Sequence, residues 1–245
     1  MLPVAILAGG LATRLRPVTA SLPKALLPVA GRPFIAWQLE LLARQGVTQV
    51  VLCLGFLGEQ IRTAVGDGSG FGLQIRYSYD GHQPLGTGGA LRHALASLGE
   101  AFFVLYGDSY LPCPFARIEG AYHAARAPAL MTVLRNQDRW DKSNVLYRDG
   151  RIVEYNKQAP TADMAHIDYG LGILSARTLQ ERADCVAFDL ADLYHELSLR
   201  GELAGVEVDG RFYEIGSPAG LDDTERYLKA KPTDELVSRP GNSGI

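Results

Sequence analysis

The first half of the chain alternates short apolar runs with segments of helical periodicity. Four apolar runs are short enough to be buried strands: residues 2–8, 49–54, 73–79 and 101–106. Three segments between them repeat apolar positions at helical spacing: residues 34–45, 59–65 and 90–98. This alternation predicts a parallel sheet with helices on both faces.

After Asp108 the pattern becomes mixed. The dipeptide Asp-Gly is a strong signal for a β-hairpin turn. It occurs at Asp149-Gly150, within the apolar segment 145–155, and again at Asp209-Gly210. The remaining predicted elements are helices at 115–127, 190–199 and 218–230 and strands at 129–134 and 167–174. We therefore expect an α/β fold: a Rossmann-like, mixed and mostly parallel sheet with flanking helices, followed by a small β-rich subregion.

Composition adds limits on size and partners. A chain of 245 residues with 47% hydrophobic content can bury a sizeable core, and we expect one domain over residues 1–230. Residues 231–245 are polar and rich in Pro and Gly, which predicts a disordered tail. The net charge of -3 provides no basic field for nonspecific nucleic-acid binding, so anionic ligands must be held by local groups.

The cysteines and the apolar runs indicate the cellular compartment. Cys53, Cys113 and Cys185 lie far apart without CxxC spacing, which argues against a zinc site and a disulfide framework. No run approaches the roughly 20 apolar residues of a membrane helix, and no basic segment precedes the first run. We expect a cytoplasmic protein without membrane insertion.

Candidate chemistry follows the first strand. Gly9 and Gly10 end that strand, and Thr13, Arg14 and Lys24 come within the next fourteen residues. Glycines allow consecutive N–H groups to approach a phosphate, although the stretch is neither a Walker A loop nor a GxGxxG motif. Two glycines after a strand can also form an ordinary turn, but the nearby cations favour an anionic ligand.

Two carboxylates, Asp108 and Glu214, are candidate metal ligands. Gly107-Asp108 follows the apolar run FFVLY, at the sheet edge where ligands bind in open parallel sheets and where oxygen ligands suit magnesium. Asp108 can equally be a turn or helix-capping aspartate. Glu214 stands among apolar residues on a predicted short strand, and it can be an ordinary surface glutamate. Residues 84–91 (PLGTGGAL) form a second Gly-rich loop that leads into a helix.

These motifs together resemble a known family. The stretch LAGGLATRLRPVTASLPKALLPVAGRP, residues 7–33, is similar to the signature LAGGxGTRLxPxTxxxPKxxxPVxxxP of sugar-1-phosphate nucleotidyltransferases. The segments PLGTGGAL, YGDS, YNKQ, DYGLGI and YEIGSP follow in the order of that family. The resemblance implies the nucleotide-diphospho-sugar transferase fold, with a nucleotide-binding part at about 1–110 and a sugar-phosphate-binding part at about 111–230.

The resemblance also implies a reaction and roles for single residues. A nucleoside triphosphate and a sugar 1-phosphate would give an NDP-sugar and pyrophosphate with Mg²⁺ as cofactor, for cell-envelope or glycan precursors. Arg14 and Lys24 would be catalytic, and Asp108 and Glu214 would bind the metal. The nucleotide would be lined by Leu7, Ala8, Gly9, Gly10, Thr13 and Gly88, and the sugar phosphate by Asn144, Glu154, Lys157, Asp168 and Gly170.

Departures from the family pattern leave alternatives open. Ala12 replaces a glycine, Asn156-Lys157-Gln158 replaces EKP, and Glu214 replaces an aspartate. A cytidylyltransferase of a non-sugar phosphate such as phosphocholine shares the fold, and a catalytically inactive regulatory homologue would also bind nucleotide. The base, the sugar and a homo-oligomeric state are not decided by the sequence. By resemblance, the short chain without a β-helical extension and the segment IDYGLGI favour heptose, mannose or N-acetylmuramate activation.

Overall fold

The computed structural model describes residues 1–10, 15, 17–81, 83–182 and 186–230. Thr13 and Arg14, two of the predicted site residues, and Ala12 lie outside the described residues. The predicted tail at 231–245 also lies outside them.

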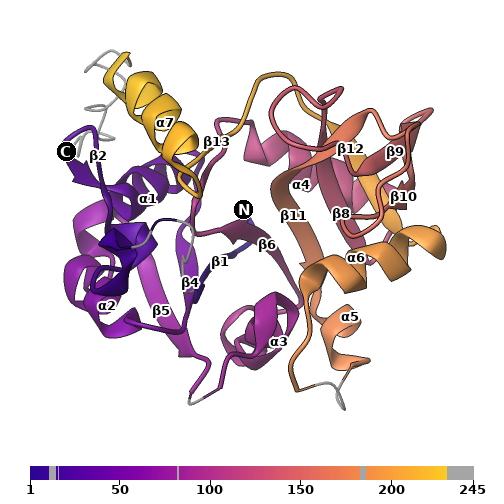
Figure 1. Ribbon diagram of the computed structural model, residues 1–245. Helices are drawn as coiled ribbons and strands as arrows, with labels where there is room; N and C mark the ends of the chain where they lie inside the picture. Colours follow the sequence, from indigo (N-terminus) through magenta and orange to yellow (C-terminus); the bar gives the residue numbers. More distant parts are fainter. Residues whose placement is uncertain (11–14, 16, 82, 183–185, 231–245) are drawn as a thin grey trace, which may run out of the picture.

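A nine-stranded sheet forms the centre of the molecule, with the order β5-β4-β1-β6-β11-β8-β12-β10-β9 (Figure 1). Its first half is parallel, as predicted: β1 pairs with both β4 and β6, and β4 pairs with β5. These strands are β1 (Val4–Ala8), β4 (Gln49–Leu54), β5 (Gln74–Tyr79) and β6 (Ala101–Tyr106). The carboxyl ends of β1 and β6 therefore lie side by side at one edge of the sheet.

Helices cover both faces of this sheet, which confirms the predicted layers. Val4 and Ile6 of β1 pack on one side, while Ala5 and Leu7 pack on the other, as the two-residue period of a strand requires. The first side is covered by α1 (Phe34–Arg44), α2 (Gly58–Val65) and α4 (Phe115–Ala125). The second is covered by α3 (Gly86–His93), α5 (Ala176–Gln180) and α6 (Leu190–Leu199).

The second half of the sheet is mixed. β11 (His166–Ser175) runs antiparallel to β6 and to β8 (Ala129–Arg135), and β12 (Leu203–Glu207) runs parallel to β8. β9 (Val145–Arg148) and β10 (Arg151–Tyr155) form the predicted hairpin. Asp149 and Gly150 have φ values of 49° and 76°, and a two-residue turn with both angles positive fits the twist of the strands.

The second predicted hairpin, at Asp209-Gly210, is wrong. Gly210 does turn the chain, with φ 104°, but the following residues leave the main sheet. Instead β13 (Tyr213–Glu214) pairs with β7 (Ser109–Tyr110), just beyond the end of β6. A local turn signal cannot reveal that a distant backbone offers the better partner, and this non-local pairing brings Glu214 beside Asp108.

The remaining elements are small or terminal. α7 (Pro218–Ala230) packs through Leu228 against a third cluster that includes Phe34 and Trp37 of α1. A two-stranded ribbon is formed by β2 (Pro28–Val29) and β3 (Arg32–Pro33). Short 3₁₀ turns lie at Val18–Ala20, Lys24–Leu26, Ser69–Phe71 and Leu95–Ser97. Among the described residues, none of the helices combines the length and hydropathy needed to cross a membrane.

Candidate functional site

The first cavity opens at the carboxyl ends of β1 and β6. Its volume is about 320 Å³, and it joins the loop after β1 to the start of α3. The predicted residues that line it are Leu7, Ala8, Gly9, Gly10, Lys24 and Asp108. The structure therefore brings the predicted nucleotide-binding backbone and two charged side chains to one place.

Gly9 lies close to the backbone of a neighbouring loop. A methyl group on its Cα would lie 3.1 Å from the backbone nitrogen of Gly55, in the loop after β4. At Gly10 a methyl group would meet nothing within 4 Å. Of the two glycines, Gly9 keeps the neighbouring loops close together, and Gly10 faces open space.

Three charged side chains surround Gly216. A methyl group on its Cα would lie 2.6 Å from Glu214 Oε2, 3.4 Å from Asp108 Oδ2 and 3.6 Å from Lys24 Nζ. The β7–β13 pairing causes this convergence, since Glu214 is opposite Ser109 and Ile215 N donates to Asp108 O at 2.9 Å. Two carboxylates and one ammonium group, predicted from three separate motifs, thus form one cluster.

This cluster fits a magnesium ion that also binds phosphate. In the described part of the chain no group of three Asp, Glu, His or Cys side chains is arranged to hold a metal. Mg²⁺, however, is commonly bound by one or two carboxylates, with waters and substrate phosphates completing its shell. Glu214 is held in place by its own loop, since it accepts hydrogen bonds from Gly216 N and from Ser217 Oγ. Asp108 and Glu214 are a suitable donor pair for such an ion.

A second cavity, of about 440 Å³, shares Tyr106 and Asp108 with the first. The predicted sugar-phosphate residues that line it are Asn144, Lys157, Asp168 and Gly170. Asn144 Oδ1 accepts a hydrogen bond from Asp168 N, and Gly170 N donates to Asp168 Oδ1, both at 2.9 Å. Glu154, the fifth predicted residue, lies at a β-bulge in β10 and accepts a hydrogen bond from Asn156 Nδ2 at 3.2 Å.

Asp168 has the most perturbed carboxyl of this second cavity. Burial raises its pKa from 3.8 to about 6, and the Gly170 N–H and the Lys157 ammonium oppose that rise. Its carboxyl group is thus poised to exchange hydrogen bonds with hydroxyl groups while Lys157 supplies a positive charge.

Sequence reasoning missed several lining residues. Asp80 follows β5 and lines the first cavity, where burial raises its pKa and Leu85 N donates to its Oδ2 at 3.4 Å. The rule that ligands bind beyond strand ends would have found it, because Asp80 stands to β5 as Asp108 does to β6. Gly86 and Thr87 also line this cavity.

Gly88 is placed differently from its neighbours. It is buried, its N–H donates to Phe188 O at 3.0 Å, and a methyl group on its Cα would lie 2.1 Å from the Phe188 ring. In this structure Gly88 allows α3 to pack against the segment before α6. The helix begins at Gly86, four residues before the predicted start, since glycines carry no apolar side chain to mark it.

Trp140 lies at the second cavity, where it joins two loops. The Arg211 guanidinium carbon lies 3.7 Å from the centroid of the Trp140 ring, and Arg211 Nη2 donates to Asp223 of α7 at 3.0 Å. Trp140 therefore ties the β8–β9 loop to the segment that leads to Glu214.

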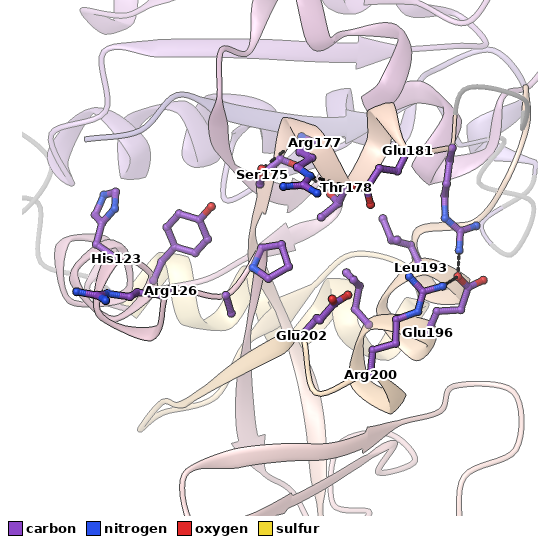
Figure 2. Close-up of a pocket in the computed structure, with 15 residues that line it drawn as sticks. His123, Arg126, Ser175, Arg177, Thr178, Glu181, Leu193, Glu196, Arg200 and Glu202 are labelled. Carbon is purple, nitrogen blue, oxygen red and sulfur yellow. Dashed lines mark hydrogen bonds and ion pairs between the residues drawn. The ribbon is translucent and has the colours of Figure 1, made fainter.

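A larger cavity of about 800 Å³ lies elsewhere, between α4, α5 and α6 (Figure 2). It shares no lining residue with the other two. Its charges are largely compensated: Arg177 pairs with Glu181 at 2.8 Å and Arg200 with Glu196 at 3.6 Å. None of the predicted site residues that the structure describes lines this cavity, although it is the most spacious of the three.

The fold is that of the nucleotide-diphospho-sugar transferase type. The chain belongs to the nucleotidyl transferase family, whose sequence pattern matches residues 4–143. This confirms the resemblance seen in the sequence.

Several relatives are enzymes of sugar 1-phosphates. N-acetylmuramate alpha-1-phosphate uridylyltransferase of Neisseria meningitidis is 45% identical over 104 residues, which cover 42% of this chain and 45% of that protein. Mannose-1-phosphate guanyltransferase beta-B of Xenopus laevis is 27% identical over 98% of this chain and 69% of that protein. D-glycero-alpha-D-manno-heptose 1-phosphate guanylyltransferase of Aneurinibacillus thermoaerophilus is 28% identical over 91% of this chain and 97% of that protein. The chain thus spans less than half of the first relative's length and nearly all of the third's.

Solved structures share the fold. A putative glucose-1-phosphate thymidylyltransferase of Bacillus anthracis superposes with a TM-score of 0.83 at 19% identity, covering 95% of this chain and 97% of that chain. HddC of Yersinia pseudotuberculosis, complexed with GMP-PN, superposes with a TM-score of 0.77 at 23% identity, covering 93% of this chain and 100% of that chain. At such identities these likenesses establish the α/β architecture alone.

Proposed function

We propose that this chain joins a nucleoside triphosphate to a sugar 1-phosphate, giving an NDP-sugar and pyrophosphate. The observation that supports this most is that two cavities, each lined by one lysine, meet at Asp108. An oxygen of the sugar phosphate attacks the α-phosphorus, the bond from that phosphorus to the bridging oxygen breaks, and pyrophosphate leaves. Since the attacking oxygen is ionised near neutral pH, positioning and charge stabilisation are the main tasks of the protein.

The chain's own residues can divide these tasks. Gly9 and Gly10 let the backbone approach the triphosphate, and Lys24 lies in the first cavity close to where the second begins. From there its ammonium group can stabilise the charge that develops on the reacting phosphates. Thr13 and Arg14 retain the roles that the resemblance implies, at the triphosphate.

Asp108 and Glu214 would hold Mg²⁺. When bound, the ion would offset charge on the triphosphate and on the departing pyrophosphate. Lys157 would pair with the sugar phosphate, while Asn144, Asp168 and Gly170 contact the sugar. Glu154 is assigned to the sugar only by resemblance, and Gly88 to the base in the same way.

For the nucleobase we infer a preference for guanine. An ionised Asp80 carboxylate only accepts hydrogen bonds, and guanine presents two adjacent donors, N1–H and the 2-amino group, on one edge. Uracil and thymine place their single N3–H between two carbonyl oxygens, which a carboxylate repels. UTP is the second candidate, because the relative with 45% identity is named a uridylyltransferase.

Pyrophosphate release tests the proposal. The protein is incubated with Mg²⁺ and each of GTP, UTP, CTP, ATP and dTTP, paired with mannose, heptose, glucose and N-acetylmuramate 1-phosphates and with phosphocholine. Release with a sugar phosphate supports the proposal, and mass spectrometry identifies the NDP-sugar. Release with phosphocholine alone would establish the cytidylyltransferase alternative, and nucleotide binding without any release would establish the regulatory one.

We also propose a cytoplasmic setting, which is supported by Cys53 and Cys113, both free and buried among the described residues. A homo-oligomeric state, which the sequence does not decide, is a further proposal. Sedimentation of the purified protein over a range of concentrations tests it.

A further inference from the structure

Gln38 is a fully buried polar residue on an apolar helix. It lies in the middle of α1, whose neighbouring residues Trp37 and Leu39 are buried apolar side chains, and its exposed fraction is 1%. An amide in such a position must have hydrogen-bond partners to offset its desolvation.

The partners of Gln38 lie on both sides of Asp108. Gln38 Nε2 donates to Tyr106 O at 2.9 Å and to Ser109 O at 2.7 Å. Tyr106 is the last residue of β6 and Ser109 the first of β7, so one carboxamide spans the turn formed by Gly107 and Asp108. Both N–H groups of the side chain are used on this one turn.

Burying the Gln38 side chain costs the desolvation of a polar oxygen, which an apolar residue would avoid. Among the described residues, Gln38 Oε1 is buried and has no hydrogen-bond partner. A methionine of similar length would bury no such oxygen, but it would leave the Tyr106 and Ser109 carbonyls without these donors. The side chain is therefore suited to fixing the turn rather than to filling the core.

The turn held by Gln38 contains Asp108, so fixing the turn also fixes the position of Asp108. Asp108 Oδ2 contacts Lys24 Nζ at 2.9 Å, and Ser109 pairs in register with Glu214. A small rotation of the turn would change the position of Asp108 relative to both groups. We propose that Gln38 is a positioning residue that sets the geometry of Asp108 and, through β7, of Glu214, for the reaction proposed above, on which this inference rests.

The test compares metal binding in Gln38→Met with that of the unchanged protein. Binding of Mn²⁺ is followed by water-proton relaxation, with and without a non-hydrolysable triphosphate analogue. Outer partners of metal ligands commonly contribute tenfold or more to affinity, so we expect Mn²⁺ affinity to fall by about tenfold. Turnover should fall at low Mg²⁺ and recover at high Mg²⁺, while KM for the sugar phosphate stays within about twofold.

Thr178→Val is the matched control. Thr178 is 5% exposed on α5, on the opposite face of the sheet, and its hydroxyl donates to Ser175 O at 2.7 Å. It should change thermal stability without changing Mn²⁺ affinity. If Gln38→Met does not fold, Gln38→Asn, which retains the amide but is one methylene shorter, takes its place in the comparison.

Two failures can be told apart. Unchanged Mn²⁺ affinity and an unchanged Mg²⁺ requirement in the folded Gln38 variant would overturn the positioning role. Absence of pyrophosphate release by the unchanged protein would instead overturn the proposed function, and the Mn²⁺ titration would still report whether Gln38 affects Asp108.

Discussion

Lys24 Nζ lies 2.9 Å from Asp108 Oδ2, and this ion pair stands where the two cavities meet. Lys24 begins the 3₁₀ turn Lys24–Leu26, and Asp108 follows β6, the strand next to β1. The side chains are 22% and 33% exposed, so water only partly screens their attraction. The pair can orient both groups at once, and each partner can be tested separately.

Replacing Lys24 by alanine should lower turnover by about 10²-fold or more. The ammonium group is placed to stabilise charge that develops on the reacting phosphates, and such contacts are worth this much in other enzymes. The measurement is kcat for pyrophosphate release at saturating substrates. Lys229→Ala is the control, since Lys229 pairs with Glu225 on the surface of α7 and should leave kcat unchanged. Near-normal turnover in the Lys24 variant would contradict its catalytic role.

Replacing Asp108 by asparagine should lower the activity and weaken its dependence on magnesium. The amide keeps the size of the side chain but loses the charge that attracts a divalent cation. We expect the rate at saturating Mg²⁺ to fall by at least tenfold and its dependence on Mg²⁺ concentration to flatten. Asp67→Asn, at an exposed turn, serves as the control. A variant that keeps the full rate and the same Mg²⁺ midpoint would exclude Asp108 as a ligand.

Part of this candidate site could be predicted from strand ends. The sequence indicates where β1 and β6 end, which points to Gly9, Gly10 and Asp108, and the same rule would have found Asp80 after β5. The roles of Lys24 and of the residues at the second cavity came from the family resemblance. The position of Glu214 was not predictable in the same way. Its closeness to Asp108 comes from the β7–β13 pairing, which joins residues more than a hundred positions apart and replaces the expected hairpin. Local turn chemistry predicts a turn but not the partner of the strand that follows it.

The stability of the protein should depend on pH through Asp168. Its pKa is about 6 in the folded state and 3.8 as a free side chain, so the folded protein binds the extra proton more tightly. By linkage, the free energy of unfolding falls as pH rises from about 4 to 6, and the loss is complete above pH 6. Asp168→Asn should abolish this loss and be more stable than the unchanged protein by about 1 to 3 kcal/mol at pH 7.5, but not at pH 4. Urea unfolding of both proteins at pH 7.5 and pH 4 measures this difference in stability. The same difference at both pH values would contradict the raised pKa of Asp168.

Two glycine substitutions should have opposite effects on stability. At Gly88 an added methyl group would lie 2.1 Å from the Phe188 ring, so Gly88→Ala should cost about 1 to 3 kcal/mol as the ring moves away. At Gly120, inside α4, the same group would meet nothing within 4 Å, so Gly120→Ala should gain about 0.5 to 1 kcal/mol through helix propensity. Thermal unfolding of the two variants provides the comparison. If Gly88→Ala is as stable as the unchanged protein but binds nucleotide poorly, Gly88 serves the base rather than packing.

Asp80→Asn should shift the choice of nucleobase. Its carboxylate lines the first cavity, and Leu85 N donates to its Oδ2 at 3.4 Å. Each carboxylate oxygen has two lone pairs, so Oδ1 and Oδ2 can both accept hydrogen bonds from the two adjacent donors of guanine. An asparagine presents one donor and one acceptor, a pattern that suits uracil better than two adjacent donors. We expect kcat/KM for GTP relative to UTP to fall by about tenfold or more, because hydrogen bonds to charged groups contribute about 1.5 to 3 kcal/mol. Asp67→Asn again controls for the loss of one charge. An unchanged ratio would show that Asp80 does not read the base, and a starting preference for UTP would favour the uridylyltransferase alternative.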